Sequence, residues 1–187
     1  MSADLAVSPV AERLATSLLK PQDQAAAAAS LGIADVSLTA RHGCKGPGAI
    51  AWLESLGLPI PPNTNSWLPL DGGGLIARLG FTEFLIEGPD ALIAPIAATP
   101  RGPGVYPVLR QDAALIVGGS RLDELLRQTC NVNFRPLDPA SRPVVLTSMV
   151  GVGVTVIPEV RKGLPAVRNS SDGTHGHYLW ETLLGIA

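Results

Sequence analysis

The sequence predicts an α+β fold in which duplicated strand–helix–hairpin units form antiparallel sheets that pack against helices. A strand-like segment, a short helix and a hairpin-like pair of strands follow one another twice, about 70 residues apart. A further amphipathic helix is expected near the end of the chain. Apolar residues make up 46% of the 187 residues, which provides ample material for a core.

The first 34 residues are expected to form an N-terminal arm outside the main domain, which then spans residues 35–187. Over residues 8–19, an N-cap Ser8, a proline at the first helical position and apolar spacing indicate a short amphipathic helix. The Ala-rich stretch 20–33 is compatible with a helix or an extended arm, and we favour a linker. An amphipathic arm of this kind is often held on the surface of another protein.

The first unit is expected over about residues 35–105. Trp52, Leu53 and Leu56 recur at helical spacing, and Gly57 behind them is typical of a helix end. The predicted order is strand, glycine–proline turn, helix, Pro/Asn/Gly loop, hairpin and helix, over 35–41, 46–48, 49–57, 58–74, 75–88 and 89–98.

The second unit is expected over about residues 106–160. Ser120 is expected to cap a helix whose inner face carries Leu122, Leu125 and Leu126. The predicted order is strand, helix, loop and hairpin, over 107–119, 120–129, 131–143 and 144–158.

The repeat aligns best with Gly46 opposite Gly118 and with residues 77–86 opposite 147–156. Identity between the two halves is low, so the order of elements carries the comparison. After the second unit, a polar loop is expected from residue 161, followed by a C-terminal helix over about 177–185.

Composition excludes several classes of function. The formal charge is −2 without any basic block, and aromatic residues are few, which argues against nucleic acid as a partner. Two cysteines without a CxxC pair, no signal-peptide pattern and no apolar run of about 18 residues favour a cytoplasmic protein rather than a secreted or membrane one. Charged residues are only 16% of the chain, which suggests that a partner covers part of its surface.

The segment "RHGCKGPG" (41–48) concentrates the residues with chemical potential. Its order does not match a phosphate loop, because Lys45 precedes the second glycine of the candidate loop and no Ser or Thr follows it. A tight turn into a helix is the simpler interpretation, with a contact to an anion as the alternative. We also expect Lys45 to pair with an acidic residue, of its own chain or of a partner.

Metal binding and thiol chemistry at this segment both lack further residues at the right spacing. His42 and Cys44 would point to one face of a strand, but Cys130, His175 and His177 are distant in sequence. A reactive thiol needs a base close by, and we expect none. The tail histidines are expected to lie in a turn that precedes the last helix.

Four strings, in order, resemble the gamma subunit of heterotetrameric sarcosine oxidase. They are "DVSLTARHGCKGPGAIAWLESLGLPIPPNTNSW", "ARLGFTEFLIEGP", "RQDAALIVGGSRLDELLRQTCNVNF" and "YLWETLL", and they fall within about residues 35–187. The resemblance implies a fold similar to the folate-binding domain of the aminomethyltransferase family, to which the glycine-cleavage T-protein belongs, as does a relative of the YgfZ type.

The resemblance also implies a function for the whole complex. In that family an N-methyl amino acid is oxidatively demethylated, sarcosine giving glycine, and the one-carbon unit passes to tetrahydrofolate or leaves as formaldehyde. Alpha, beta and delta subunits are the implied partners, and they carry FAD, FMN, NAD, zinc and the folate site. The gamma subunit is implied to hold no cofactor, no metal and no catalytic residue, and to serve in assembly.

Other interpretations stay open. N-methylglutamate dehydrogenase-type complexes have related subunits, and a stand-alone folate-binding, aminomethyltransferase-like protein would share the fold. The segment "HGCKGPG" departs from the K-G-C-[YF]-x-G-Q-E motif of the YgfZ type, so the role of that cysteine does not transfer to Cys44. As contacts to other subunits we expect Arg41, Lys45, Trp52, Trp67, Tyr178 and Trp180, of which Trp52 and Trp180 have a core alternative.

Overall fold

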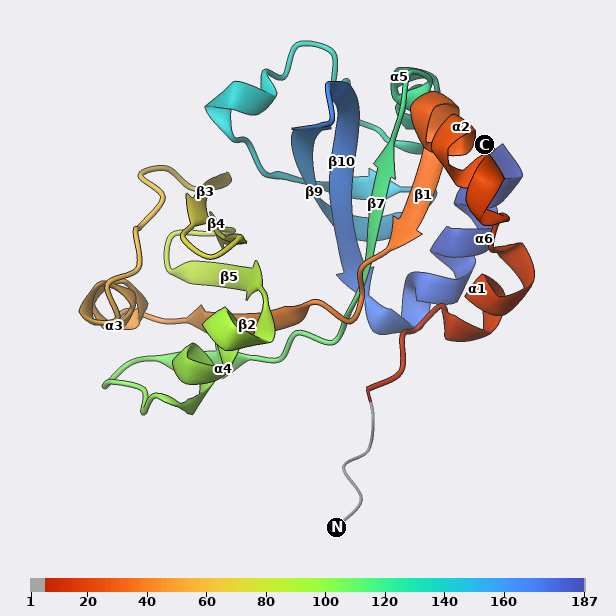
Figure 1. The fold of residues 1–187 in the computed structure, drawn as a ribbon. Coiled ribbons are helices and arrows are strands. Elements are labelled where there is room, and N and C mark those ends of the chain that lie inside the picture. The colour runs from red at the N-terminus through yellow and green to blue at the C-terminus, as the bar shows by residue number, and fades with distance from the viewer. Residues whose placement is uncertain (1–5, 187) are drawn as a thin grey trace. The chain divides into compact units, whose positions relative to one another are not determined.

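A computed structural model describes residues 6–186, and within them the chain has six α-helices and two five-stranded antiparallel sheets (Figure 1). The α+β class expected from the sequence is confirmed. The helices are α1 (Ala11–Ser17), α2 (Pro21–Leu31), α3 (Ala49–Ser55), α4 (Asp90–Ala98), α5 (Leu122–Thr129) and α6 (Gly176–Ile186). The strands are β1 (Gly32–Asp35), β2 (Ala40–Lys45), β3 (Ser66–Leu70), β4 (Gly74–Arg78), β5 (Glu83–Gly88), β6 (Tyr106–Val108), β7 (Asp112–Gly118), β8 (Val145–Met149), β9 (Val152–Arg161) and β10 (Leu164–Asp172).

The chain divides into two compact units, each with its own sheet and core. Unit 1 takes the chain up to residue 38, then 111–140 and the part from 145 onward, and its strands lie in the order β1-β7-β10-β9-β8. Unit 2 takes residues 39–110 and 141–144, with the order β3-β4-β5-β2-β6. No helix within residues 6–186 is both long enough and apolar enough to cross a membrane.

Unit 1 includes the N-terminal segment that the sequence predicted to be a separate arm. Val10 is only 1% exposed in the core of this unit, and β1 pairs with β7 from Gly32 opposite Gly118 to Asp35 opposite Leu115. The stretch expected to be a linker is helix α2, which is consistent with a proline at its first position and the high helix propensity of alanine.

The core of unit 1 lies between its sheet and helices α5 and α6. Leu122, Leu125 and Leu126 are the buried face of α5, as predicted, and alternate residues of β7 and β9 meet them from the sheet. Helix α6 adds Leu179, Trp180 and Leu183 to the same core.

The core of unit 2 lies on one face of its sheet, together with α3 and α4. The predicted helix 49–57 is found as α3, and it buries Ala49, Trp52 and Leu53. The predicted hairpin 75–88 is found as β4 and β5, and the predicted helix 89–98 as α4, which buries Ile93 and Ile96.

The two sheets repeat one topology. The order β7-β10-β9-β8 matches β2-β5-β4-β3, and α5 follows β7 as α3 follows β2. The fifth strand, β1 or β6, pairs antiparallel with β7 or β2. Within each repeat, however, β1 precedes the other elements whereas β6 follows them.

The matching residues of the repeat differ from the alignment made from sequence. Gly46 corresponds to Gly119 rather than Gly118, since each directly follows a strand and accepts a backbone hydrogen bond from the first residue of the next helix. The hairpin β4–β5 corresponds to β9–β10 rather than to β8–β9. The sequence alignment was wrong by one strand because neither β3 nor β10 was predicted.

Strand β10 was missed because its sequence, LPAVRNSSD, is polar, whereas its position between β7 and β9 makes it central. Strand β3 was missed because Pro69 interrupts its pattern, and β3 lies at the sheet edge, where proline is tolerated. The predicted strand 35–41 is broken, since Asp35 Oδ1 accepts hydrogen bonds from the backbone N–H and hydroxyl of Ser37 and turns the chain between β1 and β2.

The predicted helix caps were also wrong. Helix α5 begins at Leu122 with Arg121 as its N-cap, and the backbone N–H of Ser120 donates to the carbonyl of Ala29 instead. Helix α1 begins at Ala11, and the Ser8 hydroxyl accepts from the N–H of Val10 while donating to Asp35.

Replacing Gly119 by alanine is expected to destabilise unit 1 by about 2–5 kcal/mol. Two costs add: the strain of an alanine with positive φ, and the clash of its Cβ with neighbouring backbone. Gly119 has a φ of +131°, and a Cβ there would lie 2.3 Å from the Ser30 carbonyl oxygen. Gly163→Ala is the control, since φ is +79° and nothing lies within 4 Å of the added atom, and it should cost about 1–2 kcal/mol. Urea unfolding of both variants measures the difference, and equal costs would contradict this account.

Candidate functional site

The strand–turn–helix segment β2–α3 carries the residues with chemical potential, and the strand alternation sorts them onto two faces of the unit 2 sheet. His42 and Cys44 share the face that packs on α3, where the rings of His42 and Trp52 lie 5.7 Å apart between centroids. Arg41 and Lys45 lie on the opposite face. The chemistry expected of this segment therefore depends on what burial does to each group.

Cys44 is fully buried, with no exposed surface, inside the core of unit 2. Burial raises the pKa of its thiol to about 11, and the charge of Arg101 opposes only part of that rise. The thiol therefore stays protonated at neutral pH, which disfavours both nucleophilic attack and metal ligation. Cys130, half-buried after α5, also has a thiol pKa raised by burial.

His42 is 8% exposed, and burial, reinforced by the positive charge of Arg101, holds the pKa of its imidazole below the ordinary value. Its Nε2 has no hydrogen-bond partner among the described residues. No group of three or more His, Cys, Asp or Glu side chains suited to a metal ion occurs between residues 6 and 186. His42 is thus a neutral core residue packed on Trp52.

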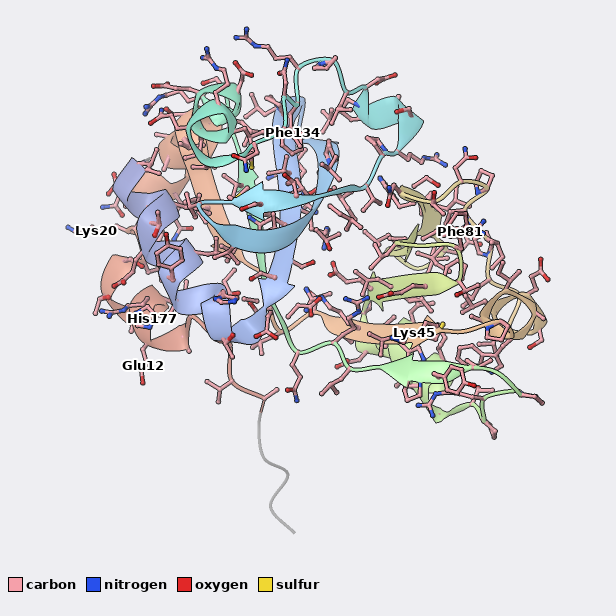
Figure 2. The ribbon with its side chains drawn as sticks, turned by 180° about the vertical axis from the view of Figure 1, so that it is seen from behind. Glu12, Lys20, Lys45, Phe81, Phe134 and His177 are labelled. Atoms are coloured by element: carbon pink, nitrogen blue, oxygen red, sulfur yellow. The ribbon has the colours of Figure 1, made fainter. Side chains whose placement is uncertain are left out.

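The two tail histidines lie where α6 begins. His175 belongs to a short 3-10 turn over Gly173–His175, which Asp172 caps by accepting a hydrogen bond from the backbone N–H of Thr174 (2.9 Å). His177, labelled in Figure 2, accepts a hydrogen bond from Arg13 of α1, and Arg13 forms an ion pair with Glu181 (3.0 Å). The turn expected before the last helix holds His175, but the expectation was wrong for His177, which is the second residue of α6.

A buried ion pair joins β2 to β5 in unit 2. Arg41 Nε lies 2.7 Å from Glu87 Oε2 in a directly opposed cross-strand pair, with the two side chains 2% and 4% exposed. Arg41 also donates to the carbonyl oxygen of Thr39 at 3.0 Å. Two desolvated charges that satisfy each other in this way fix the register of the two strands.

Of the six residues expected to contact other subunits, three are buried within this chain. Arg41 is held by Glu87, Trp52 donates to the Pro100 carbonyl oxygen at 3.0 Å, and Trp180 donates to the Ser17 hydroxyl at 3.0 Å. Trp52 and Trp180 are 6% and 4% exposed, which corresponds to the core alternative. These three side chains are therefore no longer proposed as contacts to other subunits, because they are buried within this chain.

The other three expected contact residues keep accessible surface. Lys45 is exposed, and Tyr178 is 51% exposed with its hydroxyl donating to the Val150 carbonyl at 3.0 Å. Trp67 is half-buried on the edge strand β3, with the Arg142 guanidinium 5.9 Å from its ring centroid. Lys45 and Trp67 belong to unit 2, whereas Tyr178 belongs to unit 1.

Sequence reasoning missed the most exposed apolar side chains. Phe81 at the tip of the β4–β5 hairpin is 83% exposed, Leu109 after β6 is 80% exposed, and Leu18 after α1 is 72% exposed. Tyr106 at the start of edge strand β6 is 56% exposed. In the sequence, an apolar residue in a turn or on an edge strand cannot be told apart from an apolar residue of the core. The strand order and the turns of the folded chain are needed to show that it is exposed.

Solved structures share this fold over nearly the whole length of this chain, among them a sarcosine oxidase chain and an aminomethyltransferase. A chain of heterotetrameric sarcosine oxidase from Corynebacterium sp. U-96, in complex with pyrrole 2-carboxylate, matches with a TM-score of 0.68 and 20% identity. The match covers 97% of this chain and 96% of that one. The glycine cleavage system aminomethyltransferase T from Bartonella henselae matches with a TM-score of 0.72 and 16% identity over 97% of this chain.

This chain spans 57% of the aminomethyltransferase but nearly all of the sarcosine oxidase chain. No family model and no curated protein matches the sequence. At these identities the likeness establishes the fold, and the resemblance expected from the sequence strings is confirmed at that level.

Removing one partner of the buried ion pair should cost far more stability than removing both. Arg41→Met leaves the Glu87 carboxylate buried without its cation, so we expect a loss of about 3–5 kcal/mol in the free energy of unfolding. The double variant R41M/E87L should lose less than either single variant. Urea unfolding followed by tryptophan fluorescence measures all three, and additive losses would show that the pair does not couple.

The thiol of Cys44 should resist labelling in the native protein. With C130S, which leaves Cys44 alone, we expect no reaction with a thiol reagent at pH 8 on the timescale of minutes, because the thiol is buried and protonated. With C44A, half-buried Cys130 should react measurably, and both variants should label fully in guanidinium chloride. Equal native rates for the two thiols would contradict the burial argument.

Proposed function

We propose that this chain is a non-catalytic structural subunit of a flavin-dependent complex of the heterotetrameric sarcosine oxidase type. The observation that carries the proposal is the end-to-end match to a chain of such an oxidase, which covers 97% of one chain and 96% of the other. The aminomethyltransferase, by contrast, has more than a third of its length outside the match. A match that covers nearly all of both chains favours the role of the oxidase chain over that of the aminomethyltransferase.

Burial of the reactive groups supports an assembly role. Cys44 and His42 pack in the core of unit 2, and the buried charge pair of Arg41 with Glu87 joins two strands. The low proportion of charged residues and the exposed apolar side chains favour a surface that other subunits cover. Lys45, Trp67 and Tyr178 remain the proposed contact points.

The complex so proposed would act on an N-methyl amino acid. The N-methyl carbon is oxidised to the level of formaldehyde, and it passes to tetrahydrofolate or is released as formaldehyde. The electrons pass through flavin to oxygen. In this proposal the alpha, beta and delta subunits hold FAD, FMN, NAD, zinc and the folate, and the assembly is cytoplasmic. Sarcosine is the proposed substrate, and an N-methylglutamate dehydrogenase-type complex would use the same chain with another substrate and acceptor.

A second candidate is a stand-alone folate-binding protein of the aminomethyltransferase type. The observation in its favour is the TM-score of 0.72 with the aminomethyltransferase, against 0.68 with the oxidase chain. In that case the chain alone would bind tetrahydrofolate, whereas an assembly subunit would leave folate binding to its partners.

Co-expression with the alpha, beta and delta subunits of a sarcosine oxidase-type complex from the same organism tests the proposal. We expect the tagged chain to co-purify with flavin-containing subunits, and the complex to consume oxygen when an N-methyl amino acid such as sarcosine is added. When the chain is omitted, the yield of assembled complex should fall by a larger factor than the turnover number per bound flavin, because the role of the chain is structural.

Calorimetric titration of the isolated chain with tetrahydrofolate separates the two candidates. No heat at high micromolar ligand is expected for an assembly subunit. Saturable binding together with no co-purifying flavoprotein would overturn the assembly role and favour the folate-binding protein.

A further inference from the structure

One corner of unit 2 presents a cation and an aromatic ring side by side at the edge of the sheet. Lys45, the last residue of β2, is directly opposite Tyr106, the first residue of edge strand β6. Directly opposed residues of an antiparallel pair point to one face, so the two side chains are neighbours. Lys45 is exposed and labelled in Figure 2, and Tyr106 is 56% exposed.

The charge of Lys45 is not neutralised within the described part of the chain. The carboxylate opposite it on the other side of β2 is Glu83, which is the partner of Arg110 at 2.9 Å. Lys45 forms no ion pair with residues 6–186. The three charged residues of this corner therefore sum to one excess positive charge, which favours an anionic partner group.

The ring of Tyr106 is held in place by the turn that follows β2. A Cβ on Gly46 would lie 2.7 Å from Cδ2 of Tyr106 and 2.3 Å from the carbonyl oxygen of Gly104. The ring thus packs directly on backbone, and the flanking Pro47 and Pro107 restrict the chain on either side. A side chain so placed loses little conformational freedom when a partner covers it.

The repeat shows the same corner of unit 1 in a covered state. The residues that correspond to Lys45 and Tyr106 are Gly118 and Gly32, which are likewise opposite one another. Helix α2 ends at this corner: a Cβ on Gly32 would be 2.8 Å from the Cα of Ala28, and a Cβ on the adjoining Gly119 would be 2.3 Å from the carbonyl oxygen of Ser30. A Cβ on Gly118 would instead be 2.9 Å from the Cβ of Ala166 on β10. In unit 1 both positions are glycine, and helix α2 ends at this corner. In unit 2 the same positions carry the side chains of Lys45 and Tyr106, which extend from the sheet edge.

We infer that the Lys45–Tyr106 corner of unit 2 is a docking surface for an acidic segment of a partner subunit, a carboxylate pairing with Lys45 and an apolar side chain covering Tyr106. This inference rests on the proposed function, because it assigns to that assembly one of its contacts. The carboxylate gains from the unpaired charge, and the apolar group removes the exposed ring from water.

The test measures how tightly variants of this chain bind the alpha, beta and delta subunits of the proposed complex from the same organism. Lys45→Glu and Tyr106→Ala should each weaken assembly at least tenfold, and the wild-type affinity should fall with added salt more steeply than that of a Lys45→Met variant. Lys20→Glu and Leu18→Ala are matched controls, an exposed lysine and an apolar residue 72% exposed, both in unit 1. Circular dichroism and thermal melting confirm that all five variants are folded.

The outcomes separate the two proposals. If wild-type chain assembles but Lys45→Glu and Tyr106→Ala bind like the controls, the docking surface is overturned while the proposed function stands. If the wild-type chain does not assemble with those subunits, both proposals fall. A loss confined to the two corner variants, with a reduced salt dependence for Lys45→Met, supports the acidic partner.

Discussion

The close approach of backbone to backbone at two turns is the constraint on which both halves of this fold depend. At Gly46 and at Gly119 a strand passes into a helix with positive φ, and another segment lies against the bare Cα. In unit 2 that segment contains Gly104, and in unit 1 it is the end of helix α2 at Ser30. The turn fixes how the helix leaves the strand, and hence which face of the sheet the helix can cover.

This constraint also determines the chemistry of the segment between the turn and the sheet. Once helix α4 and Trp52 of α3 lie against β2, the alternate residues His42 and Cys44 are enclosed, and enclosure makes both groups neutral at physiological pH. His42 and Cys44 therefore do not mark a reactive site, although they lie in a glycine-rich segment. They occupy positions where close packing matters and where a neutral imidazole and a thiol fit an apolar surrounding.

Local patterns were sufficient for the elements whose partners are adjacent in sequence. Helix α5, with its leucines at helical spacing, and the hairpin β4–β5 were both predicted because their signals lie within one short window. Strand β10 was not predictable in this way, since Arg168, Asn169 and Ser170 are strand residues only because β7 and β9 flank them. The same limit applies to the site: Lys45 could be singled out from its string, but its neighbour Tyr106 lies on a strand that only the topology brings beside it.

The outer strands impose an order on the folding of the nascent chain. Nearly all of unit 2 is one continuous stretch, 39–110, so its sheet can form as soon as that stretch has left the ribosome. Strand β1 is synthesised before all of it, yet within residues 6–186 it pairs with β7, and the remaining strands of that sheet come later still. Until the second half of the chain has been synthesised, the side chain of Val10, which is buried in the folded protein, stays exposed to water. A chain that stopped before β7 would therefore leave β1 without its partner strand and the side chain of Val10 without its core.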